Sequence, residues 1–169
     1  MATHDIPITT AVRFLREKTI PFEPLFYGYE ERGGTRHAAD ALAVDEHAVI
    51  KTLVMETGDR SPLIVLMHGD LEVSTRQLAR ALGVKQVAPC DPATASRHTG
   101  YMVGGTSPFG TRKKIPVYAE STIFDLPLIY VNGGKRGFLV AINPRGLRDS
   151  LNPSPVSVAI DPSAAPPPL

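Results

Sequence analysis

The chain has 169 residues, of which 43% are hydrophobic and 21% charged, and its formal net charge is +1. These values are typical of a globular domain with a sizeable core, and they exclude a chain whose overall charge alone would attract nucleic acid. Any polyanionic partner therefore needs a local basic patch. No apolar run is long enough to span a membrane, the N-terminus lacks a signal-peptide pattern, and Cys90 is the single cysteine. We expect a cytoplasmic protein.

Apolar spacing and turn residues predict short helices that alternate with strands. The predicted helices cover residues 10–20, 36–43, 75–82, 92–98 and 144–151. The strongest helix signals are Ser74, at capping-box spacing from Gln77, and Gly83, where a left-handed stop is expected. The predicted strands cover residues 25–27, 50–55, 63–67, 84–88, 114–119, 128–131, 138–142 and 156–160.

The connections between these strands indicate the fold class. Residues 57–62 form a predicted hairpin loop, so the strands on either side should pair antiparallel, and Asn132–Gly137 is expected to be a tight turn. Because the order lacks a strict strand–helix–strand rhythm, we predict a mixed α/β or α+β fold with a curled, mostly antiparallel mixed sheet or partial barrel and short flanking helices. Residues 1–160 are interpreted as one domain. Residues 161–169 contain four prolines and are predicted to form a disordered tail.

One stretch is unusually rich in glycine: Gly100 to Gly110 reads Gly-Tyr-Met-Val-Gly-Gly-Thr-Ser-Pro-Phe-Gly. Glycine allows positive φ and close approach to the main chain, so such a loop can direct bare N–H groups at a ligand. Pro108 would hold the loop in one shape. We interpret the loop as the floor of a site, and the alternative is a set of ordinary connecting turns.

Lys51 stands out because it lies within an apolar, β-rich run. Its ammonium group must either contact a ligand or face solvent, where an edge-strand lysine would hinder aggregation. Tyr27 and Tyr29 form an aromatic stretch that can stack a base or simply pack.

Several basic residues can form a rim around the glycine-rich loop, as a phosphate backbone would require, or can be ordinary solvated loop residues. They are Arg76, Arg80, Lys85, Arg97, Arg112, Lys113, Lys114, Lys135 and Arg136.

Spacing excludes several familiar sites. A phosphate-binding P-loop around Gly134 would need glycine at Ile129 and Ser or Thr at Arg136. The nucleophile-elbow pattern around Ser107 fails because Phe109 occupies its second glycine position. The histidines show no metal-ligand spacing among themselves or with Cys90, so we predict no metal and no cofactor.

Three motifs in this order resemble the YbaK and prolyl-tRNA-synthetase-associated domain family of aminoacyl-tRNA deacylases. They are Val-Ile-Lys-Thr-Leu-Val around Lys51, the glycine-rich loop, and Gly-Gly-Lys-Arg-Gly-Phe from Gly133. The resemblance covers roughly residues 10–155, and three motifs at matching separations are far more specific than one.

The resemblance implies hydrolytic editing, in which the ester between a wrong amino acid and the terminal adenosine of a tRNA is cleaved. The implied substrate is tRNA(Pro) mischarged with cysteine or alanine, attacked by water or, for cysteine, by the substrate's own thiol. Members are free-standing relatives of a synthetase insertion domain, so prolyl-tRNA synthetase is an expected partner, and neither metal nor cofactor is implied.

The resemblance also implies roles for individual residues. Lys51 matches the family's essential lysine, and Gly104 and Gly105 are expected to stabilise the oxyanion. Expected substrate-binding residues are Tyr27, Thr52, Ser107, Pro108, Asn132, Gly133 and Gly134. Expected tRNA-binding residues are Arg112, Lys113, Lys114, Lys135 and Arg136.

Three departures concern the amino-acid pocket. Asn132 stands where the cysteine-specific members have serine, Leu139 replaces an acidic residue, and Gly33-Gly34-Thr35 replaces an aromatic residue. They affect substrate identity more than reaction type. Two other functions stay open: a tRNA-binding or regulatory module without turnover, and a lyase that forms a Schiff base on Lys51.

Overall fold

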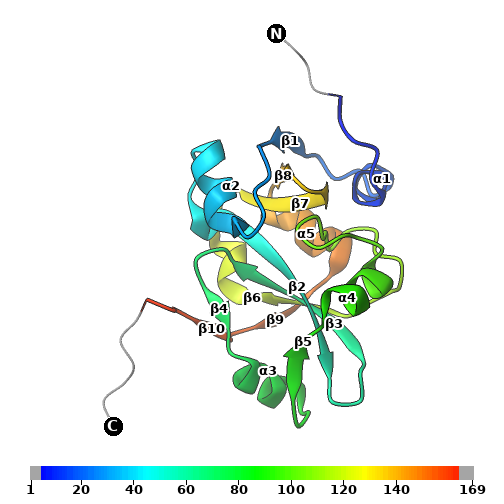
Figure 1. Ribbon diagram of the computed structural model, residues 1–169, viewed down its shortest axis with the longest axis vertical. Coiled ribbons are helices and arrows are strands. Elements are labelled where there is room, and N and C mark those ends of the chain that lie inside the picture. The colour runs from blue at the N-terminus through cyan, green and yellow to red at the C-terminus, as the bar shows by residue number, and fades with distance from the viewer. Residues whose placement is uncertain (1–4, 164–169) are drawn as a thin grey trace.

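The computed structural model describes residues 5–163, in which short helices are interspersed among strands and hairpins (Figure 1). The helices are α1 (Thr10–Glu17), α2 (Gly34–Leu42), α3 (Thr75–Leu82), α4 (Pro92–Thr99) and α5 (Pro144–Leu151), with 3₁₀ turns η1 (Glu46–Ala48) and η2 (Ser121–Asp125). The strands are β1 (Glu23–Phe26), β2 (Val49–Thr57), β3 (Pro62–His68), β4 (Glu72–Val73), β5 (Val87–Pro89), β6 (Val117–Glu120), β7 (Ile129–Lys135), β8 (Phe138–Ile142), β9 (Ser154–Val156) and β10 (Ala159–Ile160). Within residues 5–163, every helix is too short or too polar to cross a membrane.

Eight strands form one mixed sheet in the order β1-β8-β7-β2-β3-β6-β9, and β5 pairs with β2 outside this path. The β2–β7, β3–β6 and β6–β9 pairs are parallel, whereas β1–β8, β7–β8, β2–β3 and β2–β5 are antiparallel. A separate two-stranded sheet joins β4 to β10. The predicted mixed, mostly antiparallel sheet flanked by short helices is confirmed.

The hairpin of β2 and β3 lies at the centre of the core. Ile64 and Leu66 belong to one buried cluster, and Leu63, Val65 and Met67 belong to another. Because successive side chains of a strand point to opposite faces, β3 is covered on both sides. Its uninterrupted apolar sequence follows from this position. Residues on β2 are therefore anchored to a strand that is buried on both faces.

Helix boundaries agree with the predicted capping signals. The side chains of Ser74, Asp91 and Asn143 accept hydrogen bonds from backbone N–H groups in the first turns of α3, α4 and α5. Gly83 ends α3 with φ of 71°. These signals are local, so they can be read without knowledge of the tertiary fold.

The boundaries of two predicted features of the later strands were wrong. The tight turn expected over Asn132–Gly137 is confined to Arg136 and Gly137, because β7 continues to Lys135 and its register with β8 shifts between Asn132 and Lys135. The Asn132 Oδ1 atom accepts hydrogen bonds from the N–H groups of Gly134 and Lys135, which supports this bulge. The strand predicted at 114–119 begins only at Val117.

The strands predicted at 84–88 and 156–160 also differ from the structure. The strand expected at 84–88 begins at Val87, where pairing with β2 starts. The single edge strand expected at 156–160 is divided into β9, which pairs with β6, and β10, which pairs with β4. Val158 lies between them, and its N–H group donates to the Glu120 carboxylate. Most of the predicted tail, residues 164–169, lies outside the described residues.

Candidate functional site

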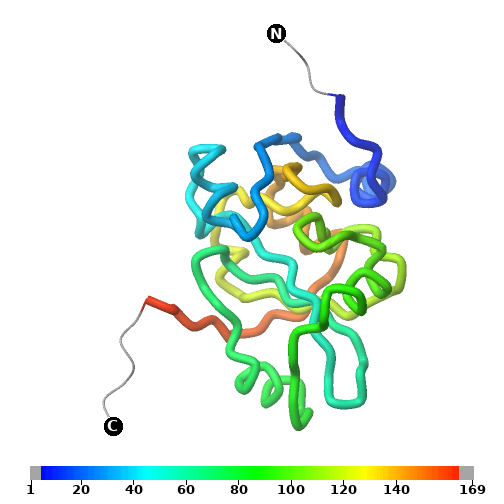
Figure 2. Tube along the Cα trace, viewed as in Figure 1, coloured from blue at the N-terminus to red at the C-terminus, as the bar shows by residue number. Residues whose placement is uncertain are grey.

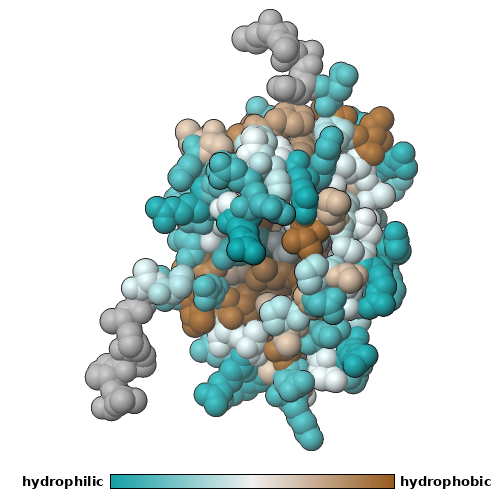
Figure 3. Space-filling view, viewed as in Figure 1, coloured by the Kyte–Doolittle hydropathy of each residue, from teal (hydrophilic) through white to brown (hydrophobic). Residues whose placement is uncertain are grey.

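A cleft of about 680 Å³ opens beside the middle of β2, between α2 and the start of α4. Figure 3 shows apolar side chains within the hollow and polar side chains along its border. The lining includes Tyr27, Tyr29, Lys51, Thr52, Val103, Gly104, Asn132, Arg136 and Leu139. The Lys51 motif, the glycine-rich loop and the Gly133 motif thus each contribute to one cleft or to the segment bordering it. A concave, mostly apolar cleft with a few polar groups is typical of a small-molecule site.

The cleft lies at a gap in the sheet. On the edge away from β3, β2 pairs with β7 only at Val49 and Ile50 and with β5 from Met55 onward, so residues 51–54 have no neighbouring strand there. The Val54 carbonyl on this edge accepts from the Cys90 N–H at 3.0 Å. Because backbone groups alternate between the two edges, the N–H and C=O of Thr52 point to the same open edge.

The side-chain hydroxyl of Thr52 is a third unused polar group. Its Oγ1 atom is buried and has no hydrogen-bond partner within the described residues. A buried hydroxyl without a partner costs free energy, so a ligand that forms a hydrogen bond with it would gain binding free energy. Thr52 therefore offers a hydroxyl and two backbone groups to a molecule in the cleft.

Lys51 is half-buried, and its Nζ atom donates a hydrogen bond to the Leu71 carbonyl at 2.8 Å. Leu71 lies in the turn after β3, and its N–H group bonds to the His68 carbonyl. The ammonium group is thus held by main chain at the border of the cleft. The alternative of a solvent-facing lysine on an edge strand is wrong, because the Lys51 side chain is half-buried, its Nζ atom is bonded to main chain, and β2 pairs with β3 along this stretch.

The glycine-rich loop is hydrogen-bonded to β7 and to the turn that joins β7 to β8. The Asn132 Nδ2 atom donates to the Gly104 carbonyl at 3.2 Å, and the Arg136 Nε atom donates to the Val103 carbonyl at 2.8 Å. The Arg136 guanidinium also lies 4.9 Å from the centre of the Tyr29 ring. Figure 2 shows these segments, far apart in the sequence, meeting in the upper half of the molecule.

Close packing explains why glycine occupies two positions of this loop. Gly104 has φ of 86°, and an added Cβ would lie 2.6 Å from the Tyr29 hydroxyl oxygen. A Cβ on Gly105 would lie 2.9 Å from the backbone nitrogen of Arg136. The Gly105 N–H already bonds to the Met102 carbonyl, whereas the Gly104 N–H has no partner within residues 5–163. Gly104 is therefore the better placed amide for a ligand oxygen.

The remaining predicted substrate residues have different positions. Tyr27 lines the cleft, and burial raises the pKa of its phenol. Ser107 and Pro108 are buried within the loop, where the Ser107 hydroxyl accepts from the Phe109 N–H. Gly133 is buried too, and its carbonyl accepts from the Thr9 hydroxyl. Gly134 is half-buried beside Thr9 and Tyr101. These four residues support the loop from outside the cleft lining.

The predicted basic residues are exposed on two segments. Arg112, Lys113 and Lys114 follow the glycine-rich loop, Lys135 ends β7, and Arg136 begins the turn to β8. Arg136 alone among these five lines the cleft. Arg136 therefore places a positive charge at the cleft.

Sequence reasoning overlooked part of the lining. The segment Glu30–Arg32 and His37 contribute to the cleft, and the His37 Nε2 atom lies 2.6 Å from the Gly28 carbonyl oxygen. The one available signal was the cluster of charges before Gly33-Gly34. Cys90 also lines the cleft, although a lone cysteine in sequence suggested only packing.

Comparison with known families agrees with this geometry. Residues 31–150 match the family model of the aminoacyl-tRNA editing domain. The chain belongs to this family. The resemblance inferred from the three motifs is thereby confirmed.

Individual relatives span the chain to different extents. It is 27% identical over 145 residues to EbsC of Enterococcus faecalis, named as a candidate Cys-tRNA(Pro)/Cys-tRNA(Cys) deacylase, and the match covers 85% of this chain and 88% of the relative. It is 34% identical over 86 residues to the proline–tRNA ligase of Brachyspira hyodysenteriae, covering 51% of this chain but 15% of the ligase.

Solved structures share the fold. A hypothetical protein superposes with a TM-score of 0.82 at 20% identity, covering 90% of this chain and all (100%) of that chain. A crystal structure described as a candidate trans-editing enzyme for prolyl tRNA synthetase superposes with a TM-score of 0.80 at 18% identity, covering 92% and 99%.

Proposed function

We propose that the protein is an aminoacyl-tRNA deacylase that hydrolyses the ester of mischarged tRNA(Pro), with cysteine or alanine as the amino acid removed. Membership of the editing family and the similarity to EbsC support the reaction class. The observation that supports the site is the meeting of Lys51, the open edge at Thr52 and the Gly104 amide in one cleft.

Each of these groups suits one part of the substrate. In the proposed reaction a water oxygen bonds to the ester carbonyl carbon, the bond to the ribose oxygen breaks, and the water proton ends on that oxygen. The Gly104 N–H would stabilise the oxyanion that forms. The backbone carbonyl of Thr52 would accept a hydrogen bond from the α-ammonium group, and the Lys51 ammonium would hold the 3′-terminal phosphate or orient the aminoacyl group.

The lining of the cleft supports selection of a small, uncharged side chain. Leu139 and Val49 are buried and apolar where they border the cleft, and Asn132 already uses its side chain to hold the loop. An editing site that excludes larger residues by size supplies discrimination that one methylene of binding cannot supply. Arg136 at the cleft, together with the exposed basic residues of the two predicted segments, would contact the acceptor-end phosphates.

We further propose that the protein acts in trans beside prolyl-tRNA synthetase. The relatives named proline–tRNA ligase contain a segment similar to this chain. An editing domain outside the synthetase can capture tRNA after the synthetase releases it.

The test is release of labelled amino acid from tRNA(Pro) charged separately with alanine, cysteine and proline. Wild type should deacylate the alanyl or cysteinyl form and spare the prolyl form, and Lys51→Ala should lose on the order of 100-fold or more in rate. Lys18→Ala, at an exposed lysine outside the cleft lining and outside the predicted basic rim, is the matched control and should retain full rate. Binding of charged and uncharged tRNA without release would instead identify a tRNA-binding module.

A further inference from the structure

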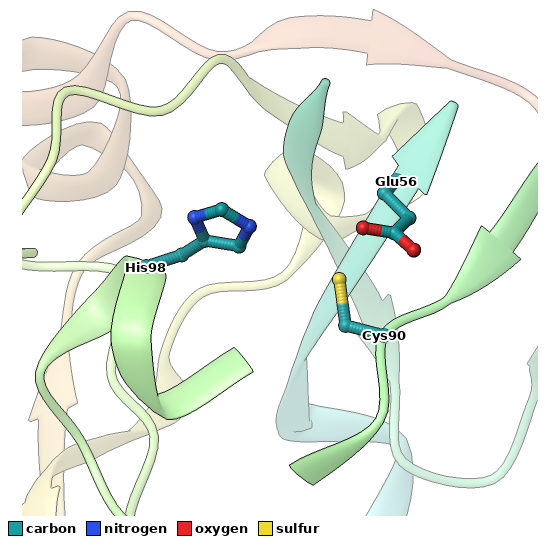
Figure 4. A group of neighbouring side chains, drawn as sticks. All are labelled: Glu56, Cys90 and His98. Atoms are coloured by element: carbon teal, nitrogen blue, oxygen red, sulfur yellow. The ribbon is translucent and has the colours of Figure 1, made fainter. Parts of the chain in front are cut away.

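A second group of reactive side chains lies at one end of the cleft. Glu56 on β2, Cys90 just after β5 and His98 on α4 each offer one ligand atom, and these atoms all lie within 4.8 Å of one another. Figure 4 shows the three side chains pointing toward a common space. None of the groups proposed to act in ester hydrolysis belongs to this cluster.

The backbone explains how residues so distant in sequence meet. Met55 pairs with Pro89 and Glu56 with Ala88, and the Cys90 N–H bonds to the Val54 carbonyl. Helix α4 begins directly after its N-cap, Asp91, so His98 lies about two turns along the helix. All three side chains are half-buried and attached to regular or tightly bonded backbone.

The donor set indicates the kind of ion. A thiolate, an imidazole and a carboxylate are the ligands that zinc uses, and three protein ligands leave a fourth position open. Ligand atoms of a tetrahedral zinc lie about 3.3–3.8 Å apart, so side-chain movements of about 1 Å would close the site. We propose that Glu56, Cys90 and His98 form a zinc-binding site. Histidine and cysteine spacing alone had predicted no metal.

Two features oppose zinc binding: the proton on the Cys90 thiol and the Lys113 ammonium group beside His98. Burial and the neighbouring Glu56 carboxylate raise the pKa of the Cys90 thiol to about 11, so zinc must displace the thiol proton. The Lys113 Nζ atom lies 3.2 Å from His98 Nδ1, and an ammonium group only donates. In the zinc-bound form Nδ1 carries the proton, Nε2 binds the ion, and the exposed Lys113 side chain turns to solvent.

The position of the site gives zinc a structural consequence. Helix α4 ends at Thr99, its C-cap Gly100 begins the glycine-rich loop, and Cys90 is also part of the cleft lining. Zinc would therefore connect β2 to the helix that precedes this loop. Because the ion binds only the folded chain, it should raise the Tm by about 5–10 °C at zinc concentrations about 100-fold above Kd.

The experiment is titration of the full chain with Zn²⁺ in competition with a chromophoric chelator, repeated with Co²⁺. One equivalent should bind, and Co²⁺ should produce a thiolate-to-cobalt absorption band. Cys90 is the only cysteine, so this band reports on it alone. Cys90→Ser should abolish the band, and Glu56→Gln or His98→Gln should each weaken zinc binding by at least about 10–100-fold.

Two further variants separate this site from unspecific binding. Lys113→Gln should strengthen zinc binding, because it removes the opposing charge beside His98. His47→Gln removes another histidine, one that pairs with Asp70 outside this cluster, and should leave zinc binding unchanged. The proposal is wrong if no equivalent binds, if Co²⁺ gives no thiolate band, or if the cluster variants bind as tightly as wild type while remaining folded by circular dichroism.

Discussion

The Nζ atom of Lys51 donates a hydrogen bond to the carbonyl oxygen of Leu71 at 2.8 Å. Among residues 5–163, no carboxylate lies within salt-bridge distance of this ammonium group. Its position therefore depends on the end of the β2–β3 hairpin rather than on a charged partner. An ammonium held by a neutral carbonyl keeps its positive charge available for a substrate.

Substitutions of Lys51 should distinguish the effect of its charge on the deacylation rate from the effect of its side-chain length. Lys51→Met keeps the length of the side chain and should lower kcat/KM for deacylation by about 100–1000-fold, while the free energy of unfolding changes by about 1 kcal/mol or less. Lys51→Arg keeps the charge but changes the donor geometry, so its rate should lie between those of wild type and Lys51→Met. Single-turnover deacylation and urea unfolding measure the two effects. Equal rates for Lys51→Met and wild type would eliminate the proposed role.

Gly104→Ala should impair the loop more than backbone strain alone explains. The position combines φ of 86° with a clash against Tyr29. Gly83 is the matched control, because it has φ of 71° with nothing within 4 Å of an added Cβ. Gly83→Ala should cost about 1 kcal/mol in unfolding free energy and leave deacylation unchanged. Gly104→Ala should lose at least about tenfold in deacylation rate. Similar rates for both variants would contradict a role for Gly104 packing.

The Asn132 side chain should hold the glycine-rich loop against β7. Asn132→Asp keeps the oxygen that accepts from Gly134 and Lys135 but removes the N–H donor to the Gly104 carbonyl. We expect about a 5–30-fold loss in kcat/KM, corresponding to about 1–2 kcal/mol, with little change in stability. Hydrogen exchange should increase in residues 100–110. Unchanged exchange in this loop would show that the hydrogen bond from Asn132 to Gly104 does not order residues 100–110.

His68 should make the fold sensitive to mild acid. Its side chain is 0% exposed, and Nδ1 donates to the His47 carbonyl. In the neutral ring Nε2 accepts from the Thr122 hydroxyl. Burial lowers the pKa of His68. The unfolded chain takes up a proton near pH 6.5 and the folded chain resists it, so stability is full above that pH and falls as the pH decreases toward the folded pKa.

The loss should reach up to about 1.4 kcal/mol per pH unit within that window. Urea unfolding between pH 7.5 and 5 measures it, and His68→Asn, which does not titrate, should flatten the dependence. An equally steep dependence in that variant would assign the effect to another group.

Local signals determined much of this protein from sequence alone. Ser74, Gly83 and Asp91 mark helix ends through bonds to their own neighbours, so their meaning does not depend on the rest of the fold. The order of the three motifs was sufficient to identify the family.

Only the tertiary structure decided how those parts work together. The gap in the sheet beside Thr52 arises because β7 and β5 meet β2 at opposite ends, and no local pattern specifies such long-range register. For the same reason the Gly105 amide proved to be occupied by Met102, and Glu56, Cys90 and His98 came together from three separate elements. Chemistry that depends on contacts across the chain becomes visible only after the chain has folded.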